Sequence, residues 1–255
     1  MDVIIGSSMR VGRDTTHEGL LATRRYAEET RAFFLKHLGH INVFLQSGDE
    51  PGPAWVVNMR PHWKIYQDMG FKFYTAGSSA LYHKGGYIYD MHPSASFPEN
   101  AEQTRKWNEI GHAYVGWYAS QHVGVENPSY IRKQYGLAPY RNNFSMLCNY
   151  SFSINPWNDL SKDTYKPMVF AYCTRGELVD TMAWEGFREG VDDIRYATRL
   201  RQLALEARDA AGGIERRYAG RRALQYLADI DVTGGDMNVI RLEIIDRILA
   251  LEALR

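Results

Sequence analysis

The fold of this chain is decided by the stretch Ile41-Asn42-Val43-Phe44-Leu45-Gln46-Ser47-Gly48-Asp49-Glu50-Pro51-Gly52. The alternation in its first half predicts a β-strand over 41–47 with one face in a core. The glycines and the proline that follow end the strand. Two adjacent carboxylates, Asp49 and Glu50, therefore lie at the carboxyl end of a buried strand, where α/β sheets and barrels carry out their chemistry. The alternative is a plain polar turn, because turns favour the same residue types.

Strands and helices alternate on both sides of this stretch, which is the pattern of a parallel sheet. We expect strands near residues 2–5, 41–47, 71–75, 86–91, 112–118 and 144–152. We expect helices from Thr15 or Thr16 to Leu38, over 55–69 and 98–109, and a short helix within 129–142. From Trp184 onward the pattern is helical, with helices to about 211, over 214–228 and over 236–253. The last two are amphipathic and are expected to pack on the rest.

Composition excludes several classes of function. The 255 residues carry 30 basic and 30 acidic side chains, so no net field favours nucleic acid or an anionic membrane. The two cysteines and eight histidines show no metal-ligand spacing, so we expect neither a metal nor a cofactor. No signal peptide or long apolar run is visible, which predicts a cytoplasmic protein from the sequence as written.

Two motifs resemble glycoside hydrolase family 123. The first is the strand end Gly48-Asp49-Glu50-Pro51, and the second is Trp184-Glu185-Gly186-Phe187-Arg188-Glu189-Gly190-Val191-Asp192-Asp193-Ile194-Arg195-Tyr196, which looks like the close of that family's catalytic domain. The resemblance runs from about residue 15 to 250. It implies a (β/α)8 TIM-type barrel that hydrolyses terminal β-N-acetylgalactosaminides with an adjacent Asp-Glu pair and the substrate's own acetamido group.

The resemblance also assigns roles to the pair. Glu50 is the expected general acid, with a pKa raised by partial burial and by the neighbouring carboxylate. Asp49 is expected to stay ionised and to orient the substrate's acetamido N–H, while the acetamido oxygen attacks the anomeric carbon. Because alternation sends adjacent side chains to opposite faces, both can act only if the strand curls at Gly48.

Other residues near strand ends are candidates for binding the sugar. Polar contacts are expected from Asp90 and His92, or these two cap a turn. Aromatic side chains suited to stack on a sugar ring, or alternatively to pack between loops, are Trp117, Tyr118, Tyr150 and Trp157. His62 and Trp63 are expected to pack. Four charged residues of the second motif are expected to tie its helix to the barrel: Arg188, Glu189, Asp192 and Asp193.

The length departs from the family. A complete barrel of this type needs about 250 residues before any C-terminal helix is added, and only six strands are predicted. In the family the Asp-Glu pair ends strand four, so the strand at 2–5 corresponds to strand three. We therefore expect a partial barrel over residues 1–200, incomplete at its N-terminus, and a helical extension over 201–255. A secreted or periplasmic location follows if further residues precede Met1.

Three functions stay open from the sequence. The first is a substrate-assisted N-acetylhexosaminidase, whose partner is a carbohydrate. The second is a non-catalytic carbohydrate-binding protein or partial barrel that needs a second segment or chain, by self-association or through the absent N-terminal part. The third is a double-displacement glycosidase with Asp90 or Glu126 as its nucleophile.

Overall fold

The structure, a computed structural model, describes residues 3–8, 14–76, 91–94, 101–110, 114–118, 127–149, 152, 170–210 and 213–255. Its contacts divide the chain into two compact units. The N-terminal unit comprises Met1–Tyr118 with Phe144–Met146, and the C-terminal unit comprises Ala119–Asn143 with Leu147–Arg255. The division expected at residue 200 falls inside one continuous helix, α7 (Met182–Arg208).

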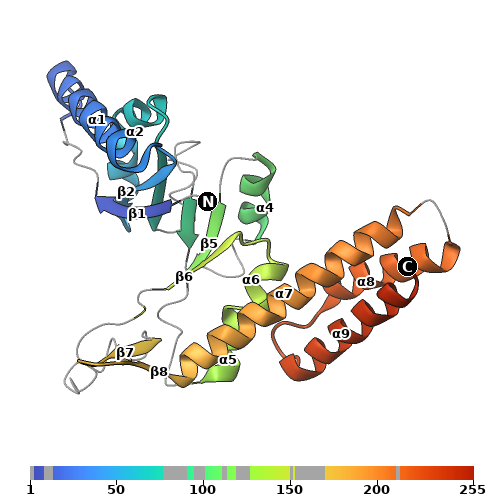
Figure 1. The fold of residues 1–255 in the computed structure, drawn as a ribbon. Coiled ribbons are helices and arrows are strands. Elements are labelled where there is room, and N and C mark those ends of the chain that lie inside the picture. The colour runs from blue at the N-terminus through green and yellow to red at the C-terminus, as the bar shows by residue number, and fades with distance from the viewer. Residues whose placement is uncertain are drawn as a thin grey trace. The chain divides into compact units, whose positions relative to one another are not determined.

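The N-terminal unit contains strands β1 to β5 of a six-stranded sheet whose strands follow one another in chain order (Figure 1). In sequence the strands of the sheet are β1 (Val3–Ser8), β2 (Val43–Asp49), β3 (Lys72–Ala76), β4 (Met91–Ser94), β5 (Tyr114–Tyr118) and β6 (Met146–Cys148). The pairs from β1 to β5 are parallel. The connecting helices described here are α1 (His17–Leu38), α2 (Pro53–Asp68) and α4 (Ala101–Ile110). The expected mixed α/β architecture and sequential strand order are confirmed.

A closed barrel is not observed. Among the described residues no strand pairing joins β1 to β6, so the sheet has two edges. Two strands also differ from their predicted limits. The strand predicted to end at Met91 instead runs from Met91 to Ser94, where Pro93 pairs with Gly116 although proline lacks the N–H of a regular ladder residue. Of the strand predicted over 144–152, the described residues form a strand only at β6, and residues 150 and 151 lie outside the described part of the chain.

The core of the N-terminal unit lies between helices α1 and α2 and strands β2 and β3. Val43 and Leu45 of β2 contribute one face to this cluster, as the alternation predicts. Phe44, on the opposite face, is also buried, with 2% of its surface exposed. Burial on both faces is characteristic of parallel sheets. The cluster is completed by side chains of the two helices and of the β3 segment: Ala27, Phe34, Val56, Met59, Trp63, Tyr66, Phe71 and Phe73.

Helix α1 begins and ends at the predicted residues. The Thr16 hydroxyl accepts a hydrogen bond from the Gly19 N–H at 3.2 Å, which satisfies one of the free donors of the first turn. At the other end Gly39 adopts φ 74°, and its N–H donates to the Leu35 carbonyl. The limits of this helix are therefore fixed by local chemistry, which is why sequence alone predicts them.

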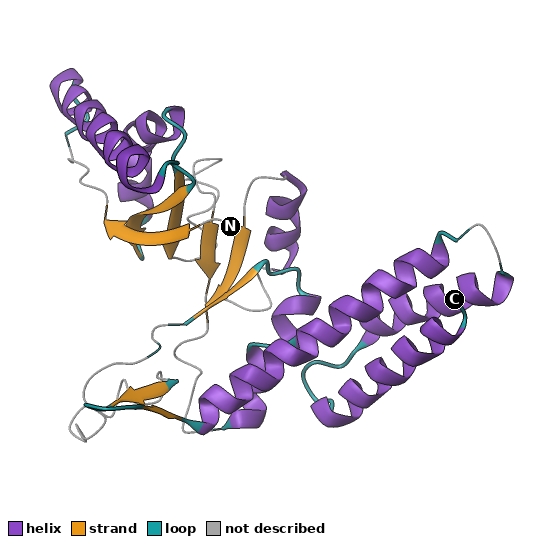
Figure 2. Cartoon of the chain, in the orientation of Figure 1, coloured by secondary structure: helices purple, strands orange, loops and turns teal. Residues whose placement is uncertain are grey.

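The C-terminal unit is mostly helical (Figure 2). Its helices are α5 (Pro128–Gln134), α6 (Leu137–Arg141), α7 (Met182–Arg208), α8 (Ile214–Asp229) and α9 (Met237–Ala253). A small antiparallel hairpin joins β7 (Ala171–Cys173) to β8 (Leu178–Asp180). The three predicted C-terminal helices and their packing are confirmed. Within the ranges given above, no helix combines the length and the apolar character that a membrane crossing requires.

Helix α2 is attached to α1 by a buried polar contact. His62 is fully buried, as expected of a packing residue, and its Nδ1 lies 2.7 Å from the Thr23 hydroxyl oxygen. The same hydroxyl donates to the Gly19 carbonyl at 3.1 Å, so the imidazole donates through Nδ1–H. In the described part of the chain Nε2 has no hydrogen-bond partner. Burial lowers the pKa of His62 below its ordinary value of 6.5, against a smaller opposing effect of the Asp14 charge.

This depressed pKa predicts a loss of stability on acidification. The unfolded chain binds a proton at His62 near pH 6.5, whereas the folded chain does so only at lower pH. The stabilising contribution is therefore complete above pH 6.5 and is lost as the pH falls toward the folded pKa. We expect thermal unfolding measured across this range to show a steeper decline for the wild type than for His62→Gln. His37→Gln, on the exposed side of α1, should behave as the wild type; equal slopes for His62→Gln and the wild type would contradict the assignment.

Candidate functional site

Strand β2 is irregular near Gly48, where the sequence analysis expects a curl. Gln46 pairs with Tyr74 of β3, and Asp49 pairs with Ala76, so three steps along β2 match two along β3. This register shift between Gln46 and Asp49 has the count of a β-bulge, with one extra residue on β2 relative to β3. Bulges re-aim side chains near active sites. The backbone therefore departs from regular strand geometry next to Gly48, where the sequence analysis expects a curl.

Glu50 lies in a backbone conformation that side-chain-bearing residues seldom adopt. Its φ is +41°, one of two positive values among the described non-glycine residues. Two residues later Gly52 precedes α2, whose first residue is Pro53. The Glu50 side chain is exposed. The partial burial expected of Glu50 is therefore not observed.

Three neighbours contact this turn, and the contacts of Thr75 and Trp55 are not predicted from the sequence. The Thr75 hydroxyl, fully buried on β3, donates to the Gly48 carbonyl at 3.1 Å. The ring of Trp55 lies so close to Gly48 that a Cβ added there would be 2.8 Å from its Cη2 atom. Pro51 is buried beside them. From the sequence, Trp55 is expected only as the first residue of the helix predicted over 55–69.

The parallel sheet places the backbone of two predicted site residues at the same edge. Asp49 is the last residue of β2 and Tyr118 is the last residue of β5. Because the strands are parallel, these two ends lie at the same edge of the sheet. His92 lies inside β4 and pairs with Val115, rather than following the strand end. The remaining three candidates lie outside the described residues: Asp90, Tyr150 and Trp157.

Trp117 occupies a core position. Only 2% of its surface is exposed, and its ring packs edge to face on Phe144 at a centroid distance of 5.5 Å. This contact favours packing, the alternative to sugar stacking that the sequence left open. The Trp117 ring therefore contributes to packing next to β5.

Within the ranges that the structure describes, no three His, Cys, Asp or Glu side chains gather in a metal-binding group. The two cysteines are free. Burial raises the pKa of the Cys148 thiol to about 12, so it stays protonated at neutral pH and is a poor nucleophile. The carboxylates after β2 are therefore the chemical groups on which a site can be built here.

The second motif packs helices together in the C-terminal unit. Its Gly186 and Gly190 lie one turn apart on α7 and face α5. A Cβ at Gly186 would lie 2.4 Å from the Pro128 carbonyl oxygen, and one at Gly190 would lie 2.8 Å from that of Arg132. Only glycine permits this approach, because both atoms that the Cβ would meet belong to the backbone.

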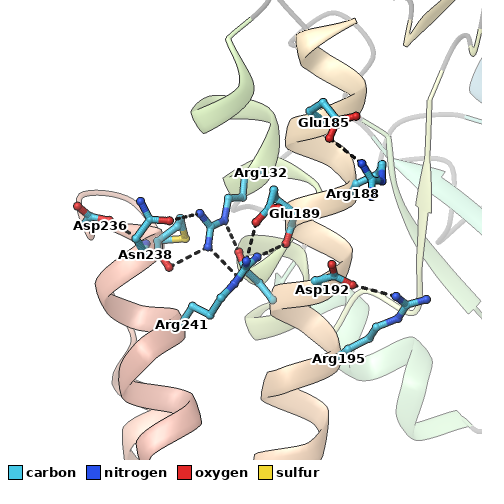
Figure 3. A network of polar contacts seen from close by, with 11 residues as sticks. Arg132, Glu185, Arg188, Glu189, Asp192, Arg195, Asp236, Asn238 and Arg241 are labelled. Atoms are coloured by element: carbon cyan, nitrogen blue, oxygen red, sulfur yellow. Dashed lines mark hydrogen bonds and ion pairs between the residues drawn. The ribbon is translucent and has the colours of Figure 1, made fainter. Parts of the chain in front are cut away.

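The close approach lets Arg132 of α5 reach a buried carboxylate (Figure 3). Asp193 of α7, 1% exposed, accepts from Arg132 Nε at 2.6 Å and from Nη2 at 3.0 Å. Arg241 of α9 donates to the same carboxylate through Nε at 2.5 Å and pairs with Glu189 at 2.6 Å. Arg132 also donates to the Asn238 side chain at 2.6 Å. One carboxylate thereby joins three helices.

The other charged residues of the motif lie at the surface. Arg188 pairs with Glu185 at 2.7 Å, and Asp192 pairs with Arg195 at 2.9 Å, both within one turn of α7. The sequence predicts that Arg188, Glu189, Asp192 and Asp193 tie this helix to the barrel. In the structure Glu189 and Asp193 instead bond α7 to other helices of the C-terminal unit, while Arg188 and Asp192 form only the surface pairs within α7.

No protein-family model matches this chain, and no curated protein matches it. The resemblance to glycoside hydrolase family 123 therefore depends on the two motifs alone. Of these, the second is explained by helix packing, so the functional argument returns to Asp49 and Glu50.

The shared carboxylate gives a sharp test of stability. Asp193→Ala leaves the buried Arg132 guanidinium without its counter-charge and leaves Arg241 paired with Glu189 alone. Breaking a buried pair in this way costs about 3–5 kcal/mol. The neighbouring substitution Asp192→Ala removes only an exposed pair, worth less than about 1 kcal/mol. Urea unfolding followed by helical circular dichroism should separate the two variants clearly. Similar losses at both positions would show that the network does not stabilise the unit.

Proposed function

We propose that this chain is a glycoside hydrolase that acts on terminal β-N-acetylgalactosamine or another N-acetylhexosamine by a substrate-assisted, retaining mechanism. The observation that carries the proposal is the β-bulge before Asp49 together with the positive φ of Glu50. Asp49 is the last residue of a parallel strand and Glu50 follows it. The backbone at this point departs from regular strand geometry. Backbone strain of this kind concentrates at functional sites, and it costs of order 1–3 kcal/mol where it occurs.

In the first step of the proposed reaction, Glu50 donates its proton to the glycosidic oxygen as the bond to the anomeric carbon breaks. The acetamido oxygen of the substrate attacks that carbon and forms an oxazolinium ion. Asp49 accepts a hydrogen bond from the acetamido N–H and stabilises the developing positive charge. In the second step water attacks the same carbon and gives its proton to Glu50, so the configuration is retained and the acid is restored.

Because Glu50 is exposed, the proposed mechanism requires the bound substrate to cover it. A sugar bound over Glu50 would displace water from the carboxyl group, so that proton transfer to the glycosidic oxygen takes place in a covered site. The proposal therefore places the activation of Glu50 in the complex with substrate.

The proposal includes a (β/α)8 barrel of which β1 to β6 form a part. In that arrangement β2 corresponds to the fourth strand of the family's barrel. The exposed aromatic residues of α1 support it: Tyr26 is 42% exposed and Phe33 is 57% exposed. Side chains of this kind are normally covered by a neighbouring helix in a barrel.

A second candidate is a carbohydrate-binding protein without catalysis, or one that needs a second segment for it. The open sheet and the exposed Glu50 favour it, because a hydrolase shields its acid from water during the reaction. Binding of an N-acetylhexosamine without measurable hydrolysis would identify this function.

The loss of activity on replacing Glu50 should depend on the leaving group of the substrate. We expect Glu50→Gln to lower kcat/KM by about 10²–10⁴-fold on an alkyl or sugar aglycone, which needs protonation to leave. On a dinitrophenyl glycoside, which needs little, the loss should be far smaller. Glu28→Gln, exposed on α1, is the matched control and should leave both rates unchanged. An equal loss on both substrates would remove Glu50 from the role of acid.

The nucleophile can be identified separately. If the acetamido group attacks, a thiazoline analogue of the oxazoline should inhibit competitively, and a fluorosugar that traps carboxylate nucleophiles should leave the protein mass unchanged. Intact-mass spectrometry after incubation measures the adduct. A glycosyl adduct on Asp90 or Glu126 would establish double displacement in its place.

A further inference from the structure

Helices α8 and α9 of the C-terminal unit leave a groove between them. Both pack along α7, and they contact each other less than either contacts α7 (Figure 1). The groove has a volume of about 400 Å³. Its lining combines small apolar residues with polar ones: Ala219, Ala223, Ala250 and Leu251 with Arg222, Gln225, Tyr226 and Arg247. Alanines at a helix surface allow another helix to approach closely.

The lining of this groove contains two guanidinium groups. Arg222 and Arg247 line it and no carboxylate does, although the Glu243 carboxylate lies beside Tyr226. Arg247 lies over the Tyr226 ring at 3.7 Å and donates to the Glu243 carbonyl, and Arg222 lies 5.9 Å from the ring centroid of Tyr218. Within the described part of the chain neither guanidinium forms an ion pair. Each therefore retains donors for a carboxylate from outside.

Helix α9 carries a second apolar face that its own unit does not cover. Its inner face is buried through Ile240, Ile244, Ile248 and Leu251. On the opposite side the residues at 239, 242, 246 and 249 share one stripe, because they are spaced by three and four. Its apolar members are largely exposed: Val239 by 52%, Leu242 by 62% and Leu249 by 58%. The fourth member is Asp246, also exposed.

We propose that this stripe of α9 docks into the α8–α9 groove of a second copy of the chain, so that the protein forms a two-fold dimer. The apolar members of the stripe would cover the alanine floor of the groove, and Asp246 would meet the guanidinium groups at its rim. The charges are complementary within one sequence: the stripe carries the carboxylate and the groove carries the arginines.

The geometry of α9 favours a symmetric arrangement. The stripe and the groove lie on adjacent sides of the same helix, since Asp246 is next to Arg247 and Leu249 is next to Ala250. Two α9 helices packed antiparallel about a point between Asp246 and Arg247 bring each Asp246 beside Arg247 of the second copy. Each copy then contributes one stripe and one groove, so the contact is made twice, as in an isologous interface.

The test uses the full chain in sedimentation velocity over a range of concentrations. The wild type is expected to be a dimer. Asp246→Arg and Arg247→Glu should each weaken the dimer at least about tenfold by placing like charges together, and the double variant should restore it. Ile214→Glu, at a position 80% exposed and outside the groove lining, is the matched control and should dimerise as the wild type.

Circular dichroism of each variant shows whether the helices are intact, and Leu242→Glu provides a second disruption that leaves the groove unchanged. A wild type that stays monomeric at every concentration would overturn the proposal. Association that persists in all of these variants would also overturn it, because the contact would then lie elsewhere, for example at the open edges of the N-terminal sheet.

Discussion

The C-terminal unit depends on one buried carboxylate. Asp193 is almost wholly removed from water, and a lone charge in that position would be very unfavourable. It is tolerated because two guanidinium groups from different helices share it, with Arg132 bound through two nitrogens. Such an arrangement needs helices at a fixed distance, and Gly186 and Gly190 set it by letting α5 approach the α7 backbone. The buried ion pairs of Asp193 therefore require the close helix approach that the two glycines permit.

The N-terminal unit follows a different principle. Its core is apolar and is formed by helices lying on a parallel sheet, while the strand ends carry the polar residues. The bulge in β2 is held from beneath by Thr75 and covered by Trp55, both fixed within the packed layers. The candidate site therefore gains its shape from rigid elements, although its carboxylates lie on a turn.

Local chemistry explains which features the sequence predicts. Capping residues define α1, and the alternation of strands with helices implies the parallel order of the sheet. Features that depend on distant partners are not predicted. The β4 strand includes Pro93 because Gly116 is its partner, and the bulge exists only relative to β3. Asp192 and Asp193 are chemically identical neighbours, and only the positions of α5 and α9 decide which one is buried.

The positive φ of Glu50 has a consequence for selection. Glycine, and to a lesser extent asparagine, occupies this conformation with less strain than glutamate, so the folded state would gain from losing the carboxylate. Thermostability and chemistry would then favour different residues at this one position, in the manner of a stability–activity trade-off. A library of substitutions sorted only for folding would drift toward glycine or asparagine here. One sorted for glycan turnover would retain the acid at a measurable cost in melting temperature.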